Sequence, residues 1–172
     1  MYFEILGSKN PDAPTVVLSS GLGGSAHFWQ AQLPVLQSDY RVIVYDQNGT
    51  GRSPAILPLD YSIQSMADEL LTLLDHTKIT HCHFIGHALG GLVGLNIALQ
   101  RPEILQSLVL INAWSSPNPH TLRCFRVRQS LLHNSPPEMY LQAQALFLYP
   151  PDWILLNIQR LEQEEQHMLE HF

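Results

Sequence analysis

The feature that most constrains this chain is the alternation of short apolar runs with longer segments of helical periodicity. The runs are β-branched and almost continuously apolar, which is typical of strands buried on both faces of a parallel sheet. The longer segments repeat apolar positions every three or four residues, as crossover helices do. We therefore expect an α/β fold, a parallel sheet flanked by helices. The strands are expected at residues 15–19, 41–46, 82–86 and 108–112, and the helices at residues 26–37, 61–77 and 88–102.

After residue 112 the pattern becomes helical only. Three further helical segments follow Pro117, and prolines separate them. The sequence thus predicts a core in residues 1–114 and a separate helical region in residues 115–172.

Composition excludes several classes of protein. No segment approaches the roughly 18 uncharged apolar residues of a membrane span, and the strand-like run after Met1 is not a secretory signal, so a cytoplasmic protein is expected. The net charge of −6 argues against a nucleic-acid partner. Cys82 and Cys124 lie far apart and fit neither a zinc site nor a disulfide framework.

Two glycine-rich loops follow expected strands. "SSGLGGS", residues 19–25, contains Gly21 and Gly23, and such a loop can turn backbone N–H groups toward an anion. It lacks the lysine of a P-loop and the third glycine of a dinucleotide fingerprint. "DQNGTGRS", residues 46–53, is the second loop. Taken alone, the first loop is also consistent with a tight turn, and for the second loop a turn is the favoured interpretation.

The stretch "GHALG", residues 86–90, is more specific. It has the frame of a nucleophile elbow, G-x-S-x-G, with Ala88 where the nucleophile should stand. Small residues two before and two after the centre let strand and helix pack closely and leave the central side chain exposed. The three loops, in this order and each at a strand end, favour a catalytic scaffold over three unrelated turns.

The segments "SGLGGSAHFW", "YDQNGTGRS" and "GHALGGLVG" resemble the α/β-hydrolase superfamily. More narrowly, they and "HTLRCFRVR" and "ALFLYPPDW" resemble the RutD family, aminoacrylate or carbamate hydrolases of pyrimidine degradation. The resemblance implies a helical cap in residues 115–172, hydrolysis of a small-molecule substrate at a C–N bond other than a peptide bond, and no cofactor or metal.

The resemblance also implies the site. The backbone N–H groups of Leu22 and Leu89 would form an oxyanion hole, with Gly21, Gly23 and His87 beside it. The catalytic Asp and His follow later strands in this superfamily, so both are expected beyond Phe172, in a longer protein. An unpaired core strand would then favour association, such as a homodimer. The Asp-x-Arg-Gly sequence common in the second loop of this superfamily reads Asp46-Gln47-Asn48-Gly49 here, so Asn48 replaces the arginine.

Ala88 excludes a covalent acyl-enzyme, because its methyl group cannot attack a substrate. The leading interpretation is assisted breakdown of aminoacrylate or carbamate by proton transfer and water attack. Two alternatives stay open: an ester, lactone or amide hydrolase whose serine was replaced, and a binding protein without activity.

Histidines within the chain are weaker candidates for a catalytic base. His87, His120 and His133 could each approach a substrate, although a structural role is the commoner one for a single histidine. His167 and His171 have a spacing that can bind a metal, but a solvated helix face is favoured.

Overall fold

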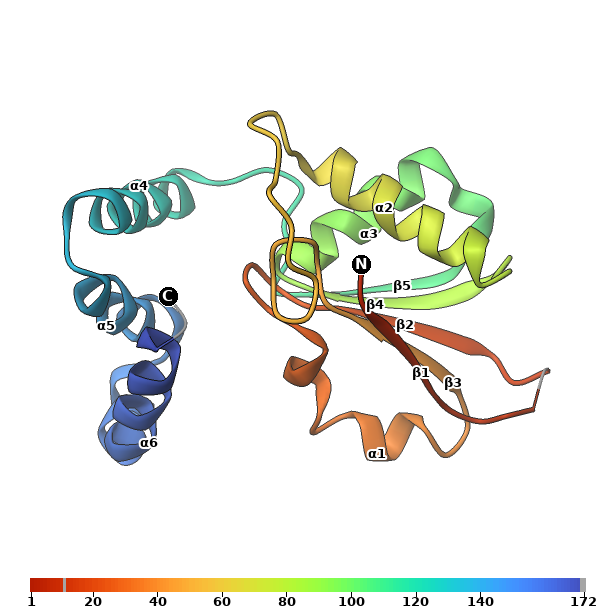
Figure 1. Cartoon of the computed structure of the whole chain (residues 1–172), viewed down its shortest axis with the longest axis horizontal. Coiled ribbons are helices and arrows are strands. Elements are labelled where there is room, and N and C mark those ends of the chain that lie inside the picture. Colours follow the sequence, from red (N-terminus) through yellow and green to blue (C-terminus); the bar gives the residue numbers. More distant parts are fainter. Residues whose placement is uncertain (11, 171–172) are drawn as a thin grey trace. The chain divides into compact units, whose positions relative to one another are not determined.

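A computed structural model describes residues 1–10 and 12–170. The contacts within it divide the chain into two units, Met1–Ser115 and Ser116–Phe172. The first unit holds the sheet and the second is helical (Figure 1). The role of the second unit as a cap stays a prediction.

The first unit is built on a five-stranded sheet with the order β1-β3-β2-β4-β5. Strands β2, β3, β4 and β5 run parallel, while β1 pairs with β3 in the antiparallel direction, so the sheet is mixed. The strands are β1 (Phe3–Gly7), β2 (Thr15–Ser19), β3 (Arg41–Tyr45), β4 (Cys82–His87) and β5 (Leu105–Ile111).

Helices cover both faces of this sheet, because its central strands are apolar on both faces. Val17 joins the cluster that includes residues of α2 (Ile63–His76) and α3 (Leu89–Gln100). Its neighbours Val16 and Leu18 point to the opposite face, where they pack with the 3-10 helix η1 (Ala26–Trp29). Figure 1 shows α2 and α3 on one side of the sheet and α1 (Leu33–Leu36) on the other.

Two expectations need correction. The helix expected at residues 26–37 is broken into η1 and α1, because Pro34 lies in the first turn of α1 and cannot donate a hydrogen bond to a preceding turn. The strand expected to be central at residues 108–112 is β5, an edge strand. Within the described residues it pairs only with β4, and Val109 and Ile111 are 46% and 38% exposed.

The second unit contains α4 (Pro119–Asn134), α5 (Pro137–Leu148) and α6 (Pro151–Leu169). Each helix begins at a proline, whose fixed φ suits the first helical position and whose missing N–H would have no helical partner there. Among residues 116–170, the buried side chains are few: Leu141, Ala145 and Leu161.

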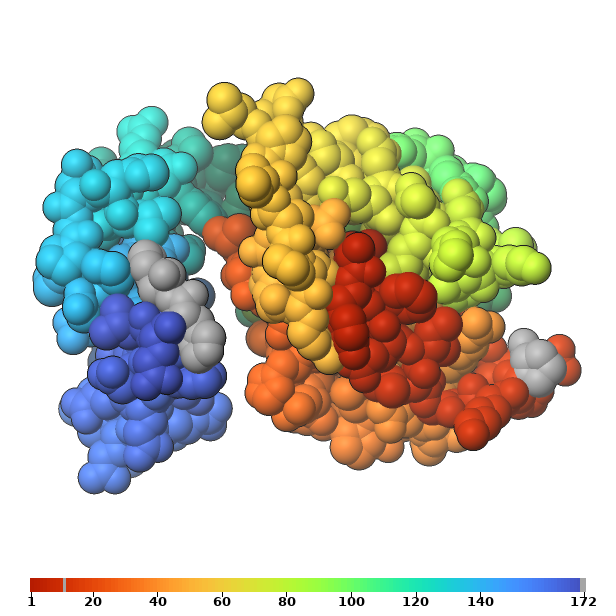
Figure 2. Space-filling view, in the orientation of Figure 1, coloured from red at the N-terminus to blue at the C-terminus, as the bar shows by residue number. Residues whose placement is uncertain are grey.

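The segment that follows β3 lies against the N-terminus of the first unit. The N–H of Tyr2 donates to Ser53 Oγ at 2.6 Å, and the Arg52 guanidinium lies 3.8 Å from the centre of the Tyr2 ring. In Figure 2 the gold segment lies beside the red N-terminal residues. These contacts with Tyr2 fix the C-terminal end of the loop that carries Asp46.

Candidate active site

The sharp turn between β4 and α3 is centred on Ala88. Its backbone has φ 48° and ψ −114°, and its N–H donates to the Ile111 carbonyl at 2.9 Å. A residue other than glycine with positive φ is held there only by its surroundings, at a cost of about 1–3 kcal/mol. The backbone geometry expected of a nucleophile elbow is therefore present at the position that lacks a nucleophile.

The glycines that flank Ala88 allow this turn. A Cβ on Gly86 would lie 2.5 Å from the Gly90 carbonyl oxygen, and a Cβ on Gly90 would collide with the Ser19 carbonyl. Strand and helix thus approach at a distance that only glycine permits at these two places. We refer to residues 86–90 as the elbow.

Backbone donors are available at the start of α3. The N–H groups of Gly91 and Leu92 bond to the Ala88 carbonyl at 3.0 and 3.3 Å. Leu89 and Gly90 come before them, and the first N–H groups of a helix have no carbonyl one turn earlier to bond. The partial positive charge of this helix end also favours an anion.

The glycine loop, residues 20–25, begins beside the elbow because Ser19 pairs with Gly86 across β2 and β4. A Cβ on Gly21 would lie 3.1 Å from His87 Nδ1 and 3.4 Å from Ala88 Cβ, so Gly21 packs directly on the elbow. Gly23 has φ +70° and open space around it, and the Leu22 side chain is 65% exposed. The convergence of the Leu22 and Leu89 N–H groups on one oxygen stays a prediction.

His87 lies between the loop and the summit of the elbow. Its ring stacks on Phe28 with centroids 4.7 Å apart and an angle of 22° between the planes. Its Nδ1 is buried without a hydrogen-bond partner, and burial lowers the pKa of the imidazole. His87 is consequently a neutral ring held in a fixed plane at neutral pH.

Sequence reasoning missed the ion pair that organises the second strand loop. Arg52 Nε bonds to the buried Asp46 carboxylate at 2.9 Å, and Arg52 Nη1 reaches Glu4 at 2.7 Å. Asp46 also accepts the Ala26 N–H at 2.8 Å. Burial alone would raise the pKa of Asp46, but the bonds from Arg52 and Ala26 outweigh it and lower the pKa to about 2. Arg52 therefore supplies a cation to this loop, in which Asn48 is uncharged.

Two further side chains at the end of β3 reach the glycine loop and were not predicted. Gln47 Nε2 donates to the Ser20 carbonyl at 3.1 Å, and Tyr45 Oη lies 2.6 Å from Ser19 Oγ. Burial raises the pKa of Tyr45 to about 12, so its hydroxyl stays protonated. No local pattern marks either contact, because each joins residues more than 25 positions apart.

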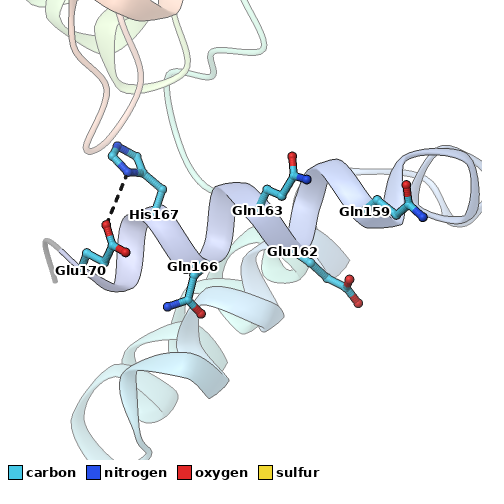
Figure 3. Close-up of a pocket in the computed structure, with 6 residues that line it drawn as sticks. All are labelled: Gln159, Glu162, Gln163, Gln166, His167 and Glu170. Atoms are coloured by element: carbon cyan, nitrogen blue, oxygen red, sulfur yellow. Dashed lines mark ion pairs between the residues drawn. The ribbon is translucent and has the colours of Figure 1, made fainter.

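The other candidate histidines lie in the second unit and do not gather a site in the described residues. His120 contacts Cys124 Sγ at 3.7 Å, and His133 lies in the last turn of α4. His167 pairs with Glu170 at 3.9 Å on a polar face of α6 (Figure 3). His171 lies outside the described residues.

The described part of the chain holds neither a cluster of metal ligands nor a helix that could span a membrane. Residues 1–10 and 12–170 contain no group of three or more His, Cys, Asp or Glu that could hold a metal ion. Among the same residues, no helix has the length and hydrophobicity that crossing a membrane requires.

Comparison with known sequences finds relatives along the whole chain. A protein of Stutzerimonas stutzeri named "Putative carbamate hydrolase RutD" is 66% identical over all 172 residues, which span 65% of its length. Proteins of the same name from Pseudomonas syringae and Pantoea ananatis are 64% and 54% identical, and the chain spans 66% and 62% of them.

Solved structures share the fold. A hydrolase from Pseudomonas aeruginosa superposes with a TM-score of 0.81 at 28% identity, over 97% of this chain and 61% of that one. An enol-lactonase from Burkholderia xenovorans gives a TM-score of 0.82 at 25% identity, over 96% and 62% of the two chains. The family model described as the alpha/beta hydrolase fold matches residues 14–153. The strained elbow, the adjoining glycine loop and these matches together show that the chain belongs to the alpha/beta hydrolase fold family.

Proposed function

We propose that this protein is a RutD-like hydrolase that assists the breakdown of a small C–N substrate, carbamate or aminoacrylate, in pyrimidine catabolism. The observation that carries the proposal is Ala88 itself, a residue without a nucleophile at the summit of an intact elbow. The relatives named as carbamate hydrolases support the substrate class. Because the chain spans 65% of the first relative, the activity of the whole protein is part of the proposal.

The proposed chemistry forms no covalent intermediate. Carbamate releases ammonia once its nitrogen gains a proton, and aminoacrylate, an enamine, takes up a proton at carbon before water attacks the resulting imine. Backbone donors that hold the substrate's carboxylate would orient it for these steps. A general acid or base would add roughly 10² to 10⁴-fold. The catalytic acid and histidine expected from the resemblance stay predictions, and no cofactor or metal is part of the proposal.

The test follows the decay of ¹³C-labelled carbamate by NMR with the complete gene product present and absent. We expect faster decay with the protein, and slower decay for Gly21→Ala, whose added methyl would intrude between His87 and Ala88. Leu99→Ala is the matched control, because this side chain is 85% exposed at the far end of α3. Carbamate binding without faster decay would replace the proposal with a binding protein.

The serine alternative needs a separate measurement. In the 172-residue chain, Ala88→Ser should give no burst of p-nitrophenolate from p-nitrophenyl acetate, because a serine hydroxyl is a weak nucleophile without an adjacent, oriented base. A burst from this variant would show that a residue within the chain, such as His87, acts as a base, and it would favour a replaced serine hydrolase.

A further inference from the structure

Three consecutive residues at the end of β3 hold both ends of the glycine loop. Tyr45 Oη lies 2.6 Å from Ser19 Oγ just before the loop, and Gln47 Nε2 donates to the Ser20 carbonyl at its first residue. Asp46 accepts the N–H of Ala26 just after it. The loop is therefore anchored at both ends from the neighbouring strand segment. Inside it, the Gly24 N–H donates to the Gly21 carbonyl at 3.0 Å, so the peptide that carries the Leu22 N–H is joined to the anchored Ser20–Gly21 peptide.

Gln47 acts on the part of the loop nearest the elbow. Its side chain and Ser20 are 4% and 2% exposed, and the bond between them measures 3.1 Å. The carbonyl of Ser20 and the N–H of Gly21 belong to one planar peptide group and point in opposite directions. A donor that fixes the carbonyl of Ser20 thus also fixes the N–H of Gly21, and with it the start of the chain toward Leu22.

We propose that Gln47 is a positioning residue that aims the N–H groups of the glycine loop at a bound carboxylate. This inference rests on the proposed function, because it takes the loop and the elbow as the anion site. Gln47 does not touch the substrate. It sets the orientation of the Ser20–Gly21 peptide, which then sets the affinity for the anion.

Amide NMR of the ¹⁵N-labelled 172-residue chain can test this with formate as the probe. In the wild type we expect the amide signals of Leu22 and Leu89 to shift on titration with formate. Gln47→Met keeps the length of the side chain and removes the donor. We expect it to raise the formate dissociation constant by about threefold to tenfold, the size of one lost hydrogen bond, and to reduce the Leu22 shift.

Asn48→Ala is the matched control. Asn48 is adjacent to Gln47 and only partly buried, and no hydrogen bond joins its side chain to the glycine loop in the described residues. We expect this variant to keep the wild-type dissociation constant and both amide shifts.

Gln47→Glu gives a readout that a merely structural role would not produce. A buried glutamic acid that is neutral can donate its O–H to the Ser20 carbonyl, whereas its ionised form cannot donate. We expect the ratio of variant to wild-type dissociation constants to fall toward one as the pH is lowered. If Gln47→Met does not fold, the pH dependence of formate binding by Gln47→Glu tests the positioning role by itself.

The outcomes separate the two proposals. If the wild type responds to formate at Leu22 and Leu89 but both Gln47 variants bind it equally well at every pH, the role of Gln47 is overturned and the anion site stands. If the wild type shows no response at either amide, the anion site itself is wrong, and the positioning role is overturned with it.

Discussion

At the scale of single residues, Ala88 combines φ 48° with ψ −114°, and the tight packing of Gly86 and Gly90 holds it there. In a hydrolase with serine at this place, the same strain presents a nucleophile. Here it presents a methyl group beside the free N–H groups that begin α3. What the turn retains is thus the placement of backbone donors at the start of α3.

The strain at Ala88 predicts that Ala88→Gly stabilises the protein. Relief of about 1–3 kcal/mol of backbone strain should exceed the roughly 0.5–1 kcal/mol that glycine costs through the unfolded state. We expect a net gain on the order of 1 kcal/mol in the free energy of unfolding, measured by urea denaturation. Gly90→Ala should lower stability, because its Cβ would collide with the Ser19 carbonyl. A less stable Ala88→Gly variant would show that the turn is unstrained.

Asp46 predicts a loss of stability in acid. Its pKa falls from 3.8 to about 2 on folding. As the pH falls, the Asp46 carboxylate is therefore protonated at a higher pH in the unfolded chain than in the folded one. Its contribution to stability is complete above about pH 5 and is lost as the pH falls toward 2. The contribution is on the order of 2 kcal/mol. The difference in unfolding free energy between wild type and Asp46→Asn should shrink by this amount between about pH 7 and pH 2.5. A constant difference would mean that Asp46 is not stabilised as a carboxylate.

At the scale of elements, the sequence predicted the strands and helices that can be recognised from their own residues. Strand β2 was expected with its observed bounds, and α3 begins at Leu89, directly after the central residue of the predicted elbow. Helices α4, α5 and α6 correspond to the three helical segments expected after Pro117, and each starts at a proline. The sequence did not predict the kink in α6, where Asn157 has φ −123° and ψ 17°.

The sequence could not predict the features of a strand that depend on its neighbours in the sheet. A short apolar strand has the same composition at the edge of a sheet as at its centre. An unpaired core strand was expected, but the sequence did not identify it as β5. The antiparallel direction of β1 was also missed, since direction is set by its partner β3 and not by its own residues.

The same limit applies to the site. Glycines and Ala88 mark the elbow and the glycine loop, because backbone geometry restricts the residues allowed there. Arg52 and Gln47 have no such local mark. Their roles arise from contacts with Asp46 and Ser20 that only the packed sheet brings into range.

At the scale of the whole molecule, the exposed edge of β5 predicts self-association. The N–H and C=O groups on one side of an edge strand have no strand partner, and three consecutive apolar residues, Val109, Leu110 and Ile111, are 46%, 41% and 38% exposed. We expect sedimentation velocity to show an average mass that rises with protein concentration, and Val109→Lys to reduce the rise.

Leu99→Lys is the control for that prediction. It places the same charge on an apolar side chain that is 85% exposed but lies on helix α3. Association should persist in this variant. A wild-type chain that stays monomeric at every concentration, or an equal effect of both lysines, would contradict pairing through β5.

The anchoring of the glycine loop from β3 also separates the stability of the loop from the identity of the side chains that it exposes. These two properties usually change together. Both ends of the loop are held by side chains outside it, whereas Leu22 at its middle is 65% exposed and a Cβ on Gly23 would meet no atom within 4 Å. Substitutions at Leu22 can thus alter what the loop faces without loosening its anchors. In a family with many substrates, such a loop lets specificity diverge between members while the stability of the core is inherited unchanged.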